Sequence, residues 1–269
     1  MTVVEALAGS GIDVAEARIL LEHASGFSRA TMAAHPEYFL NDVAADAFSS
    51  AVARRRNGEP VAYLVGEREF HSLALNVTPE VLIPRPETEL LVDFAIDFLP
   101  RGGTLADLGT GSGAIALSVK LQRPDASVSA VERSAAALEV ARANASRHRL
   151  EIEFLHGSWF DPLAARRFDV VVSNPPYVAE GDRHLAQGDL RFEPRSALVG
   201  GVDGLDEIRK IVAAAPGHLN RGGWIAIEHG QGQDDEVRNL LGQAGLESVS
   251  SLPDLAGIAR ISVGKYNPE

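Results

Sequence analysis

The chain has 269 residues, 45% of them hydrophobic, which is enough for one main core and a smaller second domain. Its formal net charge of −12 disfavours broad binding to nucleic-acid phosphates, because such binding depends on Lys and Arg. The lack of cysteine excludes disulfides and thiol catalysis, and the eight histidines show no metal-ligand spacing, so we expect no metal site. No apolar stretch approaches the roughly 18 residues of a membrane helix, and the first residues do not read as a secretory signal, so we expect a cytoplasmic protein.

The amino-terminal part has the patterns of helices. Asp13 and Glu16 have the spacing of a capping box at the start of a helix over residues 14–23. Asn41 is placed to cap a second helix over residues 43–56, which Asn-Gly then stops. We therefore predict a small helical domain at residues 1–66.

A run of three arginines ends the second of these helices. Arg54, Arg55 and Arg56 could contact an acidic partner or ribosomal RNA. We favour a solvated helix end, where the helix dipole stabilises cations. Next, alternating apolar residues around Leu73 and Leu75 predict a hairpin, so residues 67–84 read as a hairpin linker.

The remaining part, residues 85–269, alternates between helix and strand patterns. A helix over 87–98 precedes strands near 104–108, 127–132, 152–156, 168–173 and 223–229, with helical stretches between them. The last two apolar runs, 247–252 and 258–263, have no helix between them and should pair antiparallel at one end of the sheet. We predict an α/β fold with a mostly parallel sheet.

A glycine-rich loop follows the first predicted strand of this sheet. Asp107 precedes it, and its residues are Gly109, Thr110, Gly111, Ser112 and Gly113. Glycines at alternate positions let the backbone approach a ligand, and the following helix offers N–H groups to a carboxylate. Glu132 ends the next strand, roughly 20 residues on, at the distance of an acid that binds ribose hydroxyls. The loop alone fits a nicotinamide cofactor as well as S-adenosylmethionine.

Asn174, Pro175, Pro176 and Tyr177 follow the apolar run over residues 168–173, at the carboxyl end of a predicted buried strand. Ligands collect at this edge of an open α/β sheet. The two prolines stiffen the turn and donate no N–H, which leaves the Asn174 side-chain oxygen and the Pro175 carbonyl as acceptors for a planar amide or amine. Taken alone, the tetrapeptide could equally be an ordinary turn.

The motifs together resemble one family, the peptide-chain-release-factor glutamine methyltransferases, over essentially the whole chain. The similarity includes the glycine-rich loop, the Asn-Pro-Pro-Tyr motif and flanking segments at residues 83–89, 157–160, 189–194 and 254–260. The tail departs from the family pattern at Ile258-Ala259, which we expect to matter little for catalysis. The resemblance implies a seven-stranded Rossmann-like methyltransferase sheet, S-adenosylmethionine as cofactor with S-adenosylhomocysteine as product, and class I release factors as partners.

The resemblance also implies roles for individual residues. The loop from Gly109 to Gly113 would hold the methionine end of the cofactor, and Glu132 its ribose. Trp159 would pack near the adenine, although a core position is an alternative for this tryptophan. Asn174 would contact both cofactor and substrate. Glu87 and Thr88 could reach the amino-acid end of the cofactor, or only cap a helix.

Methyl transfer to a glutamine side-chain nitrogen is the function that the resemblance implies. Asn174 Oδ1 and the Pro175 carbonyl would accept both amide hydrogens, with Pro176 and Tyr177 completing the substrate site; Tyr177 would pack on the flat substrate, or only cover the loop. The long polar loop that carries His184, Arg191, Glu193 and Arg195 should receive the protein substrate together with the helical domain. Adenine-N6 methylation of DNA or RNA is the alternative, and the net charge argues against it. A binding module without methyltransferase activity is a third interpretation, which the intact motifs disfavour.

Overall fold

The structure is a computed structural model that describes residues 1–268, and it contains two compact units. The first unit consists of Met1–Glu67 together with the segment Ala186–Phe192. The second unit consists of Arg68–Leu185 and the chain from Glu193 onward. Thus the chain after the Asn-Pro-Pro-Tyr motif joins the first unit for one short segment and then returns to the second. Over residues 1–268, every helix is too short or too polar to cross a membrane.

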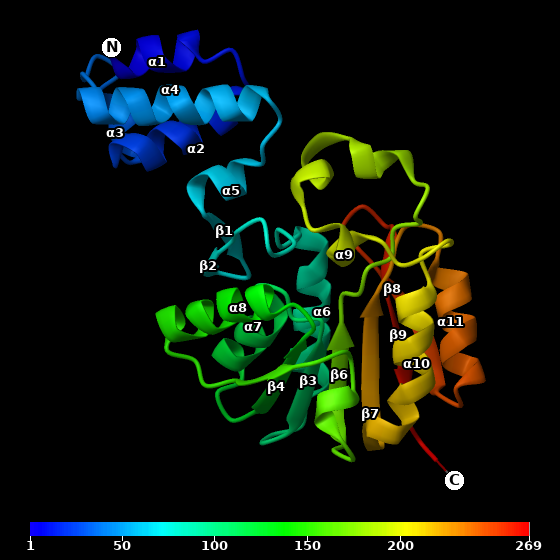
Figure 1. Ribbon diagram of the computed structural model, residues 1–269. Helices are drawn as coiled ribbons and strands as arrows, with labels where there is room; N and C mark the ends of the chain where they lie inside the picture. The colour runs from blue at the N-terminus through cyan, green and yellow to red at the C-terminus, as the bar shows by residue number, and fades with distance from the viewer. Residues whose placement is uncertain (269) are drawn as a thin grey trace. The chain divides into compact units, whose positions relative to one another are not determined.

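The first unit is helical, as the sequence predicts (Figure 1). Leu20, Leu21, Phe48 and Val52 are buried in its core. The Asn41 side chain accepts from the Ala44 backbone N–H over 2.8 Å, which confirms the predicted cap. The helices of this unit are α1 (Val3–Gly9), α2 (Val14–Ser25), α3 (Arg29–Ala34), α4 (Asp42–Arg56) and α5 (Val61–Val65), and η4 (Gly188–Phe192) is a 3₁₀ helix in its added segment.

The predicted capping box at the start of α2 is only half correct. Asp13 caps the helix by accepting from the backbone N–H groups of Ala15 and Glu16. The Glu16 carboxylate does not return to the Asp13 backbone. It instead receives two hydrogen bonds from Arg55, at 2.6 and 2.8 Å, because a bidentate ion pair competes successfully for the carboxylate.

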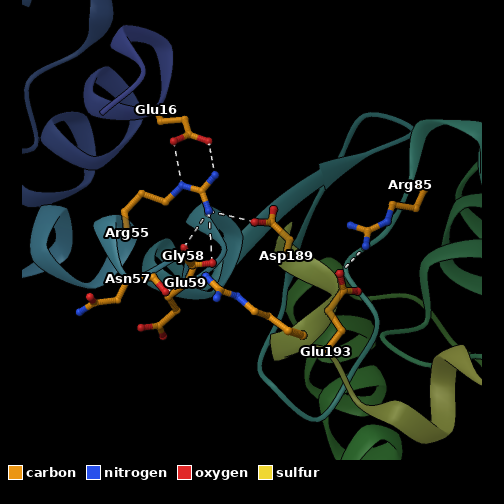
Figure 2. Close-up of polar contacts among 9 residues, drawn as sticks. Glu16, Arg55, Asn57, Gly58, Glu59, Arg85, Asp189 and Glu193 are labelled. Atoms are coloured by element: carbon orange, nitrogen blue, oxygen red, sulfur yellow. Dashed lines mark hydrogen bonds and ion pairs between the residues drawn. The ribbon is translucent and has the colours of Figure 1, made fainter. Parts of the chain in front are cut away.

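The arginine run at the end of α4 is a solvated helix end only in part. Arg54 and Arg56 are exposed, as predicted, whereas for Arg55, which is half-buried, the prediction is wrong. Figure 2 shows the Arg55 guanidinium between Glu16 and Asp189, and its Nη1 lies 2.9 Å from Asp189 Oδ1. These carboxylates raise the Arg55 pKa, against the effect of its partial burial. Arg56 donates to the Ser10 carbonyl over 3.0 Å from Nε. Two of the three arginines therefore hold the first unit together.

The hairpin consists of β1 (Glu67–Phe70) and β2 (Leu73–Asn76), which form a two-stranded sheet. His71 and Ser72 form its turn with positive φ values of 45° and 66°. Leu73 and Leu75 are buried, which confirms the predicted alternation.

A seven-stranded sheet forms the centre of the second unit, in the order β5-β4-β3-β6-β7-β9-β8. The pairs among the first five strands of this order are parallel, and β9 pairs antiparallel with both β7 and β8. This confirms the predicted fold. The strands are β3 (Thr104–Leu108), β4 (Ser127–Glu132), β5 (Glu153–His156), β6 (Phe168–Ser173), β7 (Leu219–Glu228), β8 (Glu247–Pro253) and β9 (Ala259–Lys265).

Helices cover both faces of this sheet. Leu105 faces one hydrophobic core with α6 and α7, while the next residue, Ala106, faces the other core with α10 and α11. The α-helices are α6 (Glu89–Phe98), α7 (Ala114–Gln122), α8 (Ala135–His148), α9 (Arg195–Leu198), α10 (Asp206–His218) and α11 (Asp234–Gln243) (Figure 1). Short 3₁₀ helices are η1 (Pro86–Thr88), η2 (Asp161–Leu163) and η3 (Arg183–Ala186).

The register of the strands brings their carboxyl ends to one edge. Leu108 of β3 pairs with Val131 of β4 and Ser173 of β6, and Ser173 in turn pairs with Ile227 of β7. The residues that follow these strands or end them, Gly109, Glu132, Asn174 and Glu228, therefore lie at the same edge. The chain order of the strands reverses between β3 and β6, and such a switch point is where open α/β sheets bind ligands.

Candidate active site

A pocket within the second unit opens at this edge of the sheet. It brings together most of the site residues that the sequence predicts, from four separate segments: Gly109, Thr110, Gly111, Ser112, Glu132, Trp159, Asn174 and Pro176. Gly113, Pro175 and Tyr177 are not among the lining residues. Residues of the glycine-rich loop and of the Asn-Pro-Pro-Tyr motif therefore share one cavity, although they lie far apart in the sequence.

The glycine-rich loop has a backbone that only glycine adopts readily. Gly109, Gly111 and Gly113 have φ values of 77°, 55° and 86°. The N–H groups of Gly109 and Thr110 both donate to the Val131 carbonyl, at 2.9 and 3.0 Å, which fixes the loop to β4. A Cβ placed on Gly111 would meet open space, so the backbone at this point is exposed to a ligand.

Asp107 fixes the same loop from inside. It is fully buried, and its Oδ2 accepts from the Thr110 hydroxyl over 2.6 Å and from the Ala116 N–H over 3.2 Å. Burial raises the Asp107 pKa to about 7, although both hydrogen bonds act against the shift. This carboxyl therefore links the glycine-rich loop to the first turn of α7.

Glu132 is held at the wall of the pocket by two backbone groups. Its Oε2 accepts from the Gly111 N–H over 3.0 Å, and its Oε1 accepts from the Ser134 N–H over 2.8 Å. A carboxylate oxygen can accept more than one hydrogen bond, so both oxygens keep acceptor capacity. The side chain is thus oriented beside the loop before any ligand arrives.

Trp159 forms another wall. Its indole Nε1 donates to Glu207 Oε2 over 2.7 Å, which fixes the ring at its polar edge. The ring lies so close to Gly109 that a Cβ at that position would be 3.1 Å from Trp159 Cζ3. An aromatic surface therefore lies against the glycine-rich loop, and Trp159 is a pocket residue as well as a partner of the core.

Asn174 enters the pocket from the end of β6. Its Nδ2 donates to the Thr88 hydroxyl over 3.1 Å. Thr88 is 5% exposed and lies at the junction of η1 and α6, where its side chain makes no capping hydrogen bond. The helix starts with a 3₁₀ turn here and α6 itself begins at Glu89, two residues later than the sequence predicts. Thr88 also lines the pocket. A contact between Thr88 and the amino-acid end of the cofactor stays a prediction.

The rest of the tetrapeptide packs inward. Pro175 and Pro176 are buried, and the Tyr177 side chain packs against the core beneath the pocket. The Tyr177 hydroxyl donates to Glu228 Oε1 over 3.1 Å, and burial raises the Tyr177 pKa above its ordinary value. In this structure Tyr177 supports the motif from inside, and stacking on a substrate remains a prediction.

Residues of the polar loop after the motif have internal partners. Glu193 is buried, accepts from the Ile83 N–H over 3.1 Å and forms an ion pair with Arg85 (Figure 2). In the first unit, Arg191 donates to the Asn57 carbonyl over 2.8 Å. His184 pairs with Asp182, and Arg195 is directed at the Glu180 carbonyl. Substrate contacts of these residues remain a prediction.

The sequence interpretation missed several residues of the site. One of them is Glu228. The available signal was its position at the end of an apolar strand, which resembles the position of Asn174 directly after one. The Asn174–Thr88 contact joins residues 86 positions apart, which no local pattern reveals. Further walls come from Glu80, Val81, Leu82, Ser134, Ala137, Ser196 and Ala197.

The sheet order, the glycine-rich loop and the pocket at the switch point define a methyltransferase of the Rossmann-like class. Family models match the chain at residues 87–190, as the methyltransferase small domain, and at residues 3–66, as the PrmC N-terminal domain. Two relatives are named release factor glutamine methyltransferase. That of Neisseria gonorrhoeae is 47% identical over 99% of this chain and 98% of its own length. That of Bordetella pertussis is 51% identical over 96% of this chain and 97% of its own length.

Among solved structures, a methyltransferase from Pyrococcus furiosus matches with a TM-score of 0.58 and 20% identity, over 82% of this chain and all of that one. This likeness shows the shared fold. The chain belongs to the release factor glutamine methyltransferase family, which confirms the resemblance in its motifs. It is therefore an enzyme of the methyltransferase class.

Proposed function

We propose that this enzyme transfers the methyl group of S-adenosylmethionine to the side-chain nitrogen of the glutamine in the Gly-Gly-Gln loop of class I release factors. S-adenosylhomocysteine and a proton are the other products, because the amide nitrogen loses one hydrogen as it gains the methyl group. The observation that carries the proposal is the orientation of Asn174 in the pocket. Its Nδ2 is engaged by Thr88, so its oxygen is left as an acceptor beside the glycine-rich loop.

The pocket residues fit the proposed cofactor. Open space at Gly111 leaves room for a ligand against the backbone, and the loop from Gly109 to Gly113 would hold its methionine end. Glu132 would accept from the ribose hydroxyls, since both of its oxygens keep acceptor capacity. Trp159 would contact the adenine. Bound S-adenosylmethionine supplies an electrophilic methyl group.

The acceptor motif compensates for a poor nucleophile. Amide resonance withdraws the lone pair of the glutamine nitrogen, so its orientation decides its reactivity. Asn174 Oδ1 and the Pro175 carbonyl would accept its two hydrogens, and no residue within 1–268 donates to either oxygen. Holding reactants in a productive arrangement contributes up to roughly 7–11 kcal/mol, so no strong general base is needed.

The protein substrate would be received by the helical first unit and by the loop after Tyr177. This division rests on the position of the segment Ala186–Phe192, which follows the acceptor motif in the chain and belongs to the first unit. Its Asp189 is bound to Arg55 there. A cytoplasmic location agrees with a substrate of the translation apparatus.

Labelled S-adenosylmethionine tests the proposal. The enzyme is incubated either with a class I release factor or with adenine-containing DNA, and the labelled product is digested for mass spectrometry. We expect a mass shift of one methyl group on the glutamine of the Gly-Gly-Gln loop, and none on DNA. Label in DNA alone would replace this function by adenine methylation.

A further inference from the structure

Trp159 is held by a carboxylate that lies outside the pocket. The indole Nε1 donates to Glu207 Oε2 over 2.7 Å. Glu207 lies in the first turn of α10, its side chain is 16% exposed, and it is not among the residues that line the pocket. An indole has one N–H donor and no acceptor, so this contact uses its whole hydrogen-bonding capacity. Trp159 therefore offers a ligand only the surface of its ring.

The ring of Trp159 has neighbours at two opposite edges. Its N–H edge binds Glu207, while its benzene edge lies against Gly109, where a Cβ would come within 3.1 Å of Trp159 Cζ3. The Gly109 backbone is itself fixed, because its N–H donates to the Val131 carbonyl over 2.9 Å. The contact with Gly109 limits how far the ring can move inward, whereas the hydrogen bond to Glu207 gives the ring its direction.

The backbone at Trp159 is strained. Its φ is 47°, in the left-handed region that a bulky residue with a Cβ seldom adopts. The segment is tied to the end of β4, because the Gly157 N–H donates to the Glu132 carbonyl over 3.0 Å. A strained conformation persists only where the surrounding contacts hold it. The hydrogen bond to Glu207 is such a contact on the side chain of Trp159.

The start of α10 gives Glu207 a fixed position. The Asp206 N–H donates to the Gly200 carbonyl over 2.8 Å. Arg209 forms ion pairs with the carboxylates of Asp203 and Asp206. The first turn of α10 is therefore joined to the loop before it, and a side chain in this turn can hold a partner in place.

The Glu207 carboxylate uses both of its oxygens. While Oε2 accepts from the indole, Oε1 accepts from Lys210 Nζ over 2.9 Å. Partial burial acts to raise the Glu207 pKa, but the hydrogen bonds from Lys210 and Trp159 lower it overall, so the carboxyl is ionised near neutral pH. A hydrogen bond to an ionised acceptor is stronger than one between neutral groups. The indole is therefore held more firmly than a neutral acceptor would hold it.

We propose that Glu207 is the positioning residue of the cofactor site: by binding the indole N–H it keeps the ring of Trp159 at the wall of the pocket against which the adenine packs. The inference rests on the proposed function, in which Trp159 contacts the adenine, and deepens it. Glu207 acts on the cofactor only through Trp159, since it does not line the pocket. It should therefore set the affinity for S-adenosylmethionine and leave the chemical step unchanged.

The substitution Glu207→Leu removes the acceptor and keeps a side chain of similar size. The ring of Trp159 can then leave the wall, so we expect the dissociation constant of S-adenosylmethionine, from calorimetry, to rise about tenfold. The kcat with a release factor at saturating cofactor should stay within about threefold, because the reacting atoms keep their neighbours. A loss of folded enzyme would give the opposite pattern, a lower kcat with an unchanged dissociation constant.

Matched variants separate the acceptor from the rest of the side chain. Glu207→Gln keeps an oxygen that can accept from the indole, and it should bind S-adenosylmethionine within about threefold of the wild type. Lys210→Met removes the partner of the other Glu207 oxygen and should leave the dissociation constant unchanged. Glu207→Ala should repeat the rise seen in Glu207→Leu, and thermal unfolding of each variant checks that it is folded.

Fluorescence reports the position of the ring directly. The chain has two tryptophans, so in a Trp224→Phe background only Trp159 emits. In this background we expect Glu207→Leu to make the emission more readily quenched by acrylamide, because the ring gains access to solvent. Glu207→Gln should leave the quenching close to that of the parent protein. This readout needs neither cofactor nor release factor.

A double-mutant cycle tests whether Glu207 acts through the ring. Trp159→Phe keeps an aromatic ring but lacks the N–H, so in this background Glu207→Leu should raise the dissociation constant by less than about twofold. If the wild-type enzyme binds S-adenosylmethionine and Glu207→Leu binds it as tightly, or keeps its full effect beside Trp159→Phe, the positioning role is wrong. If the wild-type enzyme binds no S-adenosylmethionine, the proposed function itself fails, and this inference with it.

Discussion

Asn174 Nδ2 lies 3.1 Å from Thr88 Oγ1, and this contact joins the end of β6 to the start of α6. The two residues are 86 positions apart, yet the contact decides which atom of the Asn174 amide faces the pocket. Thr88 is nearly buried, so little water competes for its hydroxyl. The side chain of this threonine at a helix start thus holds the Asn174 amide and does not cap the helix.

The substitution Thr88→Val tests this contact. Valine has the same shape but no hydroxyl, so the Asn174 amide loses its acceptor and can rotate. We expect kcat to fall about tenfold while cofactor affinity is retained. Thr88→Ser keeps the hydroxyl and should remain within about threefold of the wild-type kcat. Weaker cofactor binding with unchanged kcat in Thr88→Val would instead favour a contact between Thr88 and the cofactor.

Removal of the acceptor itself should have the largest effect. Asn174→Ala deletes the side-chain oxygen that would receive a glutamine hydrogen, so methyl transfer should become undetectable while cofactor affinity changes little. Single-turnover transfer and calorimetry measure the two quantities. The matched control is Asn220→Ala, because Asn220 Nδ2 donates to Asp169 Oδ1 over 2.8 Å at the other end of the strands. Near-normal turnover in Asn174→Ala would contradict the acceptor role.

Gly111→Ala should weaken cofactor binding. The new methyl group would enter the open space of the pocket, and the positive φ of 55° adds strain of about 1 kcal/mol. We expect the dissociation constant of S-adenosylmethionine to rise at least about tenfold. Gly245→Ala carries the same backbone strain, at φ 79° with nothing near its Cβ, and should leave cofactor binding unchanged. Equal binding by both variants would exclude the predicted cofactor role of Gly111.

The sequence was sufficient for the sheet because local patterns determine its strands. Strands β3, β4 and β6 begin and end at the predicted residues, because each is an apolar run with a clear end. Gly109 follows β3, Glu132 ends β4 and Asn174 follows β6. β7 begins at Leu219, four residues before the predicted start. The pair Gly222-Gly223 coincides with an irregularity in the pairing of β7 with β6.

The site could be predicted only in part. The glycine-rich loop and Asn174 carry short motifs, whereas Glu228 and Tyr177 meet across 51 positions and only the packed sheet joins them. Likewise, the sequence shows Arg55 as one of three similar arginines. Its partners Glu16 and Asp189 lie 39 and 134 positions away, so only the folded chain distinguishes it from Arg54.

This difference between neighbouring arginines is testable. The Arg55 side chain is 19% exposed and binds two carboxylates (Figure 2). Arg54 is 55% exposed and pairs with Glu59. Arg55→Ala should lower the free energy of unfolding by roughly 1–3 kcal/mol, because it leaves the half-buried Glu16 without its partner. Arg54→Ala should change it by less than about 0.5 kcal/mol. Urea unfolding of the full chain measures both, and equal effects would contradict the structural role of Arg55.

Glu228 makes stability depend on pH. Burial raises its pKa from 4.5 to about 7, so between these values the folded protein holds a proton that the unfolded chain has released. The unfolding free energy is therefore highest below about pH 4.5 and falls as pH rises to about 7. Glu228→Gln removes this pH dependence of the unfolding free energy, which is on the order of 3 kcal/mol. The pH dependence that comes from Asp107, whose pKa is also raised to about 7, remains in the variant.

Urea unfolding at pH 5.5, 6.5, 7.5 and 8.5 measures this effect directly. Relative to the wild-type enzyme, Glu228→Gln should become more stable as pH rises, with most of the change below pH 7.5, because only the wild type must bury an ionised carboxylate there. Glu247→Gln, at an exposed position, should run parallel to the wild type. Parallel curves for Glu228→Gln and the wild type would show that this carboxyl is not ionised at the expense of folding.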